Sequence, residues 1–160
     1  MNNSKNNITE GVLDIRVNDI KNGIILFNKK NKDGIDVYLN DIKINMINED
    51  NKWKIDYNFK KHGKYKFKII FNNNITTFHR FFQDCSNFYS IDLCNFVSKN
   101  VTDISYMFNL CHKSKETKGM NKLNTSNVNN MKAMIQDCYE LEFLDLSNFN
   151  ASIVMDVIYV

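Results

Sequence analysis

"VTDISYMFNLC" (Val101–Cys111) and "VNNMKAMIQDC" (Val128–Cys138) are two phrases of the same length that begin on Val and end on Cys. A related phrase runs from Ile75 to Cys85, and the next anchor after Val128 is Val154. The four anchors are separated by 26, 27 and 26 residues. A fixed period in this range indicates a repeat array, in which each unit packs mainly against its neighbours.

Each phrase carries apolar residues at positions i, i+3, i+4 and i+7. In the second unit these are Ile104, Met107, Phe108 and Cys111. This spacing puts all four side chains on one face of a helix. Thr76, Thr102 and Asn129 follow the anchors, where a side-chain oxygen would cap the helix start. The pattern therefore predicts one helix per unit, with each Cys closing the buried face as a small hydrophobe.

A strand-like phrase follows each of these segments. "FYSIDLCNF" (Phe88–Phe96) and "LEFLDLSNF" (Leu141–Phe149) place their apolar residues at the same offsets, whereas the middle phrase "SKETKGMNKL" keeps only part of the pattern. We therefore expect one strand per repeat beside the helix.

The front half has a period of two instead. Five or six short strands are predicted between residues 11 and 72, with a tight turn at Asn40-Asp41. Trp53–Phe71 is predicted to form an antiparallel hairpin that covers the first repeat. Its lysine-rich part, "KKHGKYKFK" (Lys60–Lys68), is interpreted as the solvent face of that hairpin, and the alternative is a phosphate-binding strip.

The predicted fold class is α+β: a β-rich N-terminal cap followed by a short leucine-rich-repeat solenoid with one helix and one strand per 26-residue repeat. The expected divisions are a disordered tail (1–10), the β-rich unit (11–74), three repeats (75–100, 101–127 and 128–153) and a partial repeat (154–160).

Charge and composition exclude several classes of protein. The net charge of +3 is spread along the 160 residues and does not favour nucleic-acid binding. No apolar run reaches about 18 residues, so no membrane span is expected. The polar N-terminus lacks the apolar core of a signal peptide, so no signal peptide is expected. A chain without one is expected in the cytoplasm, where cysteines stay reduced.

The sequence offers little for catalysis. The four cysteines form no Cys-x-x-Cys pair, and their 26-residue spacing follows the repeat, so neither a zinc site nor another metal site is expected. Cys111 and His112 are adjacent, and neighbouring residues on a helix diverge too far to share a proton. We therefore expect a non-enzymatic protein without cofactors, in which Cys94 is the most exposed thiol.

The repeat phrases resemble the BspA-type leucine-rich-repeat family, whose 26-residue surface-protein repeat occurs in bacterial lipoproteins and protist proteins. The resemblance rests on "LEFLDLSNFNASIV" (Leu141–Val154), "LNTSNVNNMKAM" (Leu123–Met134) and "VTDISYMFNLC". It implies adhesion or protein–protein recognition, and it suggests the cell surface. The polar N-terminus thus favours the cytoplasm, whereas the family resemblance favours the cell surface.

Two hypotheses for function follow. In the first, the strand face binds a protein partner, and the candidate contact residues are Ser90, Asp92, Asn95, Glu142, Asp145 and Asn148. For Asp92 and Asp145 the alternative is a structural role, in which their side chains bond to turn backbone in neighbouring coils. In the second hypothesis the chain forms a homo-oligomer through an open C-terminal end, and the candidate residues are Val154, Val157, Ile158 and Val160.

Overall fold

The computed structural model describes residues 34–72, 75–86, 88–96 and 98–150, together with the backbone of 9–17 and 24–28. These described residues form nine strands and one short 3₁₀ helix. The elements are β1 (Thr9–Val17), β2 (Ile24–Asn28), β3 (Ile35–Leu39), β4 (Ile42–Lys43), β5 (Met46–Glu49), β6 (Lys52–Ile55), β7 (Gly63–Phe71), β8 (Phe88–Asp92), β9 (Glu116–Lys118) and η1 (Met120–Lys122).

The predicted α+β class, a leucine-rich-repeat solenoid with one helix per repeat, is wrong. Within the described residues the only helical element is η1, and the segments predicted as helices are chains of tight turns. Each chain contains two residues in the left-handed region, at equivalent places in the three units. They are Arg80 and Asp84, Tyr106 and Leu110, and Ala133 and Asp137, all with φ between 51° and 63°.

The backbone hydrogen bonds give the physical reason for this difference. In an α-helix each N–H donates to the carbonyl four residues earlier. Here the N–H groups of Phe78 and Phe82 donate to the carbonyls of Asp103 and Met107 in the next unit, at 2.9 Å each. The second unit donates to the third in the same way, for example from Phe108 N to Met134 O at 2.8 Å. The backbone therefore joins neighbouring units, and no helix forms.

The side chains that the pattern assigned to the interior are nevertheless buried. Phe78, Phe81, Phe82 and Cys85 are almost fully inaccessible, as are their counterparts in the second unit. The ring of Phe82 stacks on Phe108 with centroids 5.4 Å apart, so the core is continuous from unit to unit. The predicted buried face is confirmed although the predicted element is not.

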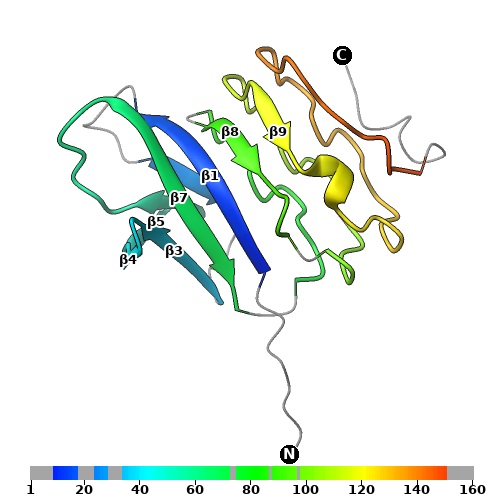
Figure 1. Cartoon of the computed structure of the whole chain (residues 1–160), viewed down its shortest axis with the longest axis horizontal. Helices are drawn as coiled ribbons and strands as arrows, with labels where there is room; N and C mark the ends of the chain where they lie inside the picture. The colour runs from blue at the N-terminus through cyan, green and yellow to red at the C-terminus, as the bar shows by residue number, and fades with distance from the viewer. Residues whose placement is uncertain are drawn as a thin grey trace, which may run out of the picture.

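One six-stranded sheet runs through both halves of the molecule, in the order β4-β3-β7-β1-β8-β9 (Figure 1). β8 and β9 are the parallel strands of the first two repeats. The third repeat continues the sheet through a single bridge from Glu116 to Phe143. The strand predicted in "FYSIDLCNF" is therefore confirmed, whereas "LEFLDLSNF" contributes only this bridge.

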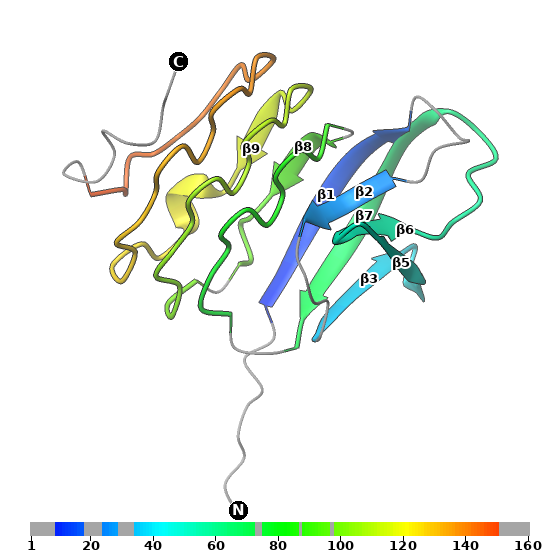
Figure 2. The same cartoon turned by 180° about the vertical axis from the view of Figure 1, so that it is seen from behind.

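A second layer completes the core. The three-stranded sheet β2-β6-β5 lies across one face of the large sheet, on the same side as the turn-rich segments of the repeats (Figure 2). Phe71 of β7 packs against Phe78, Phe81 and Phe96 with ring centroids 5.3–5.8 Å apart. These aromatic contacts join the N-terminal half to the first repeat.

The predicted hairpin Trp53–Phe71 is also wrong. β6 belongs to the smaller sheet, and β7 pairs with β1 and β3 in the larger one. Alternation correctly identifies buried positions such as Phe67 and Ile69, but it cannot identify the partner strand. The predicted turn at Asn40-Asp41 is confirmed, because both residues have positive φ and join β3 to β4.

Several predictions concern residues at the two ends. Residues 1–8 of the predicted tail lie outside the described residues, and Thr9 and Glu10 belong to β1. Val154, Val157, Ile158 and Val160, the candidates for self-association, also lie outside them. Among the described helices, none has the length and apolarity that crossing a bilayer requires.

Candidate functional site: the strand face and the polar cluster between repeats

The two acidic residues singled out on the strand face make local hydrogen bonds. Asp92 Oδ1 accepts the N–H of Cys94 at 2.9 Å. Asp145 Oδ1 accepts the N–H of Ser147 at 3.0 Å, and its Oδ2 accepts Asn121 Nδ2 of the preceding unit at 2.5 Å. The N–H and the hydroxyl of Ser147 lower the pKa of the Asp145 carboxyl, and the hydrogen bond from Asn121 lowers it further. Both carboxylates thus accept a backbone N–H of their own turn, and only Asp145 is also bonded to the preceding unit, through the Asn121 side chain.

The other predicted contact residues divide into three groups. Ser90 is buried, with only 6% of its surface exposed, and Asn95 is exposed. Glu142 pairs with Lys115 of the second unit at 2.6 Å, and Asn148 Nδ2 donates to Leu123 O at 2.7 Å. The structure thus brings Glu142, Asp145 and Asn148 together on the third unit, where each is bonded to the second.

Two aromatic side chains of the third unit are the most exposed aromatic rings among the described residues. Tyr139 is 76% exposed and Phe143 is 61% exposed. The ring of Tyr139 stacks on His112 with centroids 5.1 Å apart, and its hydroxyl donates to Asp137 Oδ1. Phe143 lies at the register position of Glu116, on the outward face of the sheet. Sequence reasoning missed both rings, although Phe143 interrupts the polar outward positions of "LEFLDLSNF".

A cleft of about 420 Å³ lies where residues 147–150, at the end of the third strand phrase, meet the segment after η1. Leu123 and Phe149 supply apolar surface, and Asn124, Ser126 and Asn148 supply amide and hydroxyl groups. None of the residues that line it is charged. Asn148 is the one predicted contact residue that contributes to its wall.

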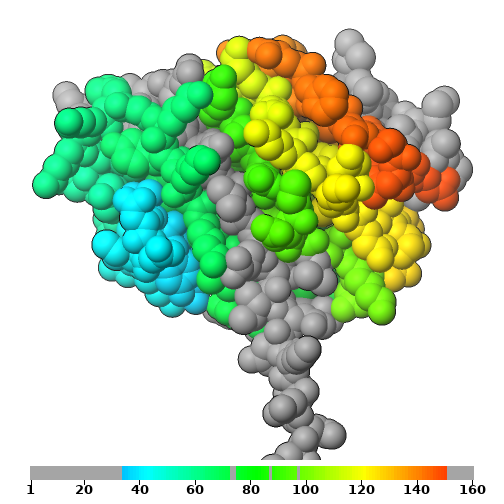
Figure 3. Space-filling view, in the orientation of Figure 1, coloured from blue at the N-terminus to red at the C-terminus, as the bar shows by residue number. Residues whose placement is uncertain are grey.

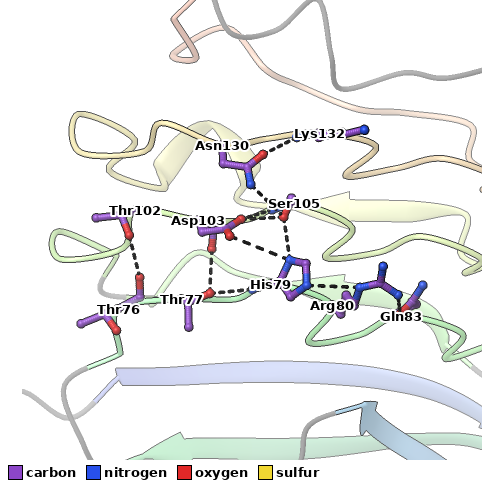
Figure 4. Close-up of polar contacts among 10 residues, drawn as sticks. All are labelled: Thr76, Thr77, His79, Arg80, Gln83, Thr102, Asp103, Ser105, Asn130 and Lys132. Carbon is purple, nitrogen blue, oxygen red and sulfur yellow. Dashed lines mark hydrogen bonds and ion pairs between the residues drawn. The ribbon is translucent and has the colours of Figure 1, made fainter.

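On the turn-rich side, a polar cluster links the three units (Figure 4). His79 Nδ1 lies 2.7 Å from Ser105 Oγ, which donates to Asp103 Oδ1 at 2.6 Å. Asn130 Nδ2 of the third unit donates to the same hydroxyl at 3.3 Å. Asp103 and Asn130 occupy equivalent positions, and each accepts the N–H two residues later in its own turn.

The cluster contains Ser, His and Asp but lacks the arrangement of a hydrolase. In a catalytic triad the carboxylate binds the ring nitrogen that faces away from the serine. Here Asp103 binds the serine hydroxyl itself, and Arg80 Nε donates to the outer nitrogen of His79 at 3.2 Å. Ser105 is also only 2% exposed. The geometry is that of a hydrogen-bond network between units, and the sequence hides it because its members are 25–26 residues apart.

The family model described as "Mycoplasma protein of unknown function, DUF285" matches residues 76–160. This chain belongs to the DUF285 family. The match begins one residue after the first anchor, Ile75, and covers all three repeat units. No curated protein and no solved structure matches the chain.

The cysteines of the DUF285 repeats serve packing and hydrogen bonding. Cys111 Sγ donates to Phe82 O at 3.0 Å, and Cys138 Sγ donates to Phe108 O at 3.1 Å, each in the preceding unit. Burial raises the pKa of Cys111 strongly and that of Cys138 to about 11. No disulfide joins the four cysteines, all of which lie in described segments, and Cys94 is the exposed one, as predicted. No group of three metal-ligating side chains occurs in the part of the chain that the structure describes.

Proposed function

We propose that this DUF285 chain is a non-enzymatic recognition module that binds a protein partner through the strand face of its repeats. The observation that carries the proposal is the exposure of Tyr139 and Phe143 on one unit. Aromatic anchors surrounded by polar groups supply most of the binding energy in many protein interfaces. The resemblance of the repeat phrases to BspA-type surface proteins also supports a role in recognition or adhesion.

The surroundings of the two rings fit such an interface. Lys115 and Glu142 form an exposed ion pair beside them, and Asp145 is held by its hydrogen bonds to Ser147 and Asn121. Held side chains lose little conformational freedom on binding, so they favour affinity. In this proposal the aromatic rings supply the energy, and Glu142 and Asp145 set the orientation of the partner.

Binding to an extract of the source organism tests the proposal. The wild-type chain is immobilised, and bound proteins are identified by cross-linking at residues near Phe143. We expect Phe143→Ala or Tyr139→Ala to weaken binding of a specific partner by about tenfold or more. Ile42→Ala is the matched control, because Ile42 is 68% exposed but lies in β4 at the other end of the sheet. Equal loss in the control variant would contradict the proposal.

Self-association is the second candidate, and the backbone of the third unit favours it. The N–H groups of Met131, Ala133, Ile135 and Asp137 occupy the positions whose counterparts in the second unit donate to the third. Within the described residues these four groups have no backbone acceptor. Light scattering over a concentration series tests this candidate. An oligomer that dissociates with Val157→Asp or Ile158→Asp would support it, and a monomer at every concentration would exclude it.

A further inference from the structure

The connection from β6 to β7 projects from the N-terminal half, at the far end of the molecule from the third repeat (Figures 1 and 3). Its underside is an aromatic cluster in which Phe59 packs edge-on against Tyr57, Tyr65 and Phe67. Tyr65 also donates its hydroxyl to Lys61 O at 2.8 Å. These contacts hold the connection in one shape.

The upper side of this connection is basic. We call Lys60, Lys61, His62, Lys64 and Lys66 the basic segment, and all five side chains are exposed. Lys64 and Lys66 are two residues apart on β7, so their side chains leave the same face of the sheet. On β1, Arg16 and Asp14 lie at their register positions, so this neighbour adds one residue of each charge.

The lysines of the basic segment lack acidic partners among the described residues and lie close together, whereas the other lysines without such partners, Lys99, Lys113, Lys122 and Lys132, are dispersed through the repeats. Lys43, Lys52 and Lys115 each form an ion pair at 2.6–2.7 Å. By contrast, Lys60, Lys61 and Lys66 form no ion pair with any residue that the structure describes. Lys64 lies over the ring of Tyr89, 4.0 Å from its centroid, and forms no ion pair within the described part of the chain. Four lysine charges within seven residues are therefore not neutralised by described acidic side chains.

The shape of this surface favours a flat anionic partner. Proteins that bind single-stranded nucleic acid combine a basic groove with several exposed aromatic rings on which bases stack. Here the segment projects outward, Phe59 is buried, and Tyr65 is half-buried. Tyr57 is the one ring of the cluster that is exposed, at 44%. A projecting group of lysines without rings for base stacking on the same side suits a surface of anionic lipid headgroups.

We propose that the basic segment docks this chain on a membrane surface rich in anionic phospholipid. The lysine ammonium groups contact headgroup phosphates and carboxylates. Lys60 and Lys61 lie in the connection that projects away from the third repeat, so docking through them leaves Phe143 free.

Vesicle co-sedimentation of the full chain tests the proposal. The probes are vesicles with about 30 mol% phosphatidylserine in phosphatidylcholine, and vesicles of phosphatidylcholine alone. We expect a partition coefficient several hundred-fold higher on the anionic vesicles, because each of four lysines contributes roughly fivefold. Binding should weaken strongly when the salt concentration is raised to about 0.5 M.

A pair of matched double variants locates the surface. Lys60→Gln with Lys61→Gln should lower the partition coefficient by about 25-fold. Lys99→Gln with Lys113→Gln removes the same net charge from exposed lysines in the repeats, and we expect a change of less than about twofold. All these side chains are exposed, so the variants should unfold at the wild-type urea concentration.

Three outcomes would overturn the proposal. The first is equal binding to both kinds of vesicle, and the second is equal loss of binding in the two double variants. The third is a comparably tight complex with a single-stranded oligothymidine probe that depends on Lys60 and Lys61, which would identify nucleic acid as the partner.

Discussion

At the scale of single residues, Gly119 is a position where an added side chain would collide with the backbone of the neighbouring unit. Its φ of 73° lies in the left-handed region, and a Cβ there would lie 2.4 Å from the backbone nitrogen of Cys94. That atom belongs to the neighbouring unit and cannot move independently of the chain. Gly119→Ala should therefore lower the free energy of unfolding by about 2–4 kcal/mol, measured by urea denaturation.

Gly63→Ala is the control for that prediction. A Cβ added at Gly63 has no atom within 4 Å, and its φ is not positive. We expect a change in unfolding free energy of less than about 1 kcal/mol. Similar losses in the two variants would mean that the close approach of Gly119 to Cys94 does not decide the effect.

The buried thiols make stability depend on alkaline pH. Burial raises the pKa of Cys138 from its ordinary value near 9 to about 11, and it raises the pKa of Cys111 further. Between those values the folded thiol keeps its proton, whereas the unfolded thiol loses it. Stability is therefore complete below about pH 9 and falls by up to about 1.4 kcal/mol per pH unit for each thiol above it.

Urea midpoints at about pH 8 and about pH 10.5 measure this effect. Cys138→Ala should reduce the loss between the two pH values, while lysines titrate equally in both proteins. Cys94→Ala is the comparison and should reduce the loss less, because the thiol of Cys94 is exposed and its pKa is raised more by its hydrogen bond to Asp92 than by burial. An unchanged pH dependence in Cys138→Ala would contradict the assignment.

At the scale of elements, the repeat segments show what apolar spacing can and cannot predict. The spacing i, i+3, i+4, i+7 correctly identified Phe78, Phe81, Phe82 and Cys85 as buried. A chain of turns buries the same positions, so the spacing could not decide between turns and a helix. The left-handed residues give no warning either, because Tyr106 and Leu110 are not of the types that usually adopt positive φ.

In the candidate site, too, the sequence could predict which positions face outward but not which residues they contact. The strand-face positions of Asp92 and Asp145 could be predicted from the two-residue alternation of the strand phrases. The hydrogen bond between Asp145 and Asn121 could not be predicted, because it depends on how one unit is placed against the next. The contact of His79 with Ser105 required the same information.

Hydrogen exchange distinguishes lateral backbone bonding from helical bonding. The N–H groups of Phe108 and Leu110 donate to the third unit at 2.8 and 2.9 Å. Their counterparts Ile135 and Asp137 have no backbone acceptor among the described residues. We expect Phe108 and Leu110 to exchange more slowly by an order of magnitude or more. Equal protection at all four positions would indicate bonding within each segment.

At the scale of the whole molecule, β1 joins the two halves into one folding unit. It pairs with β7 of the N-terminal half and with β8 of the first repeat, so neither half completes its sheet alone. The aromatic contacts of Phe71 with Phe78 and Phe96 cross the same boundary. Although the period of the sequence changes near residue 75, the sheet crosses that point without interruption.

This arrangement predicts one cooperative unfolding transition for the whole chain. Trp53, the single tryptophan, reports on the N-terminal half, and the reactivity of the buried Cys111 thiol reports on the repeats. The two probes should give the same urea midpoint. Leu13 lies at the middle of β1, opposite Phe67 and Ile91, and proline there removes a backbone donor from the sheet. Leu13→Pro should therefore lower both midpoints together, because the repeats depend on β1 as much as the N-terminal half does. Separate midpoints, or a loss confined to the Trp53 signal, would show that the repeats fold independently of β1.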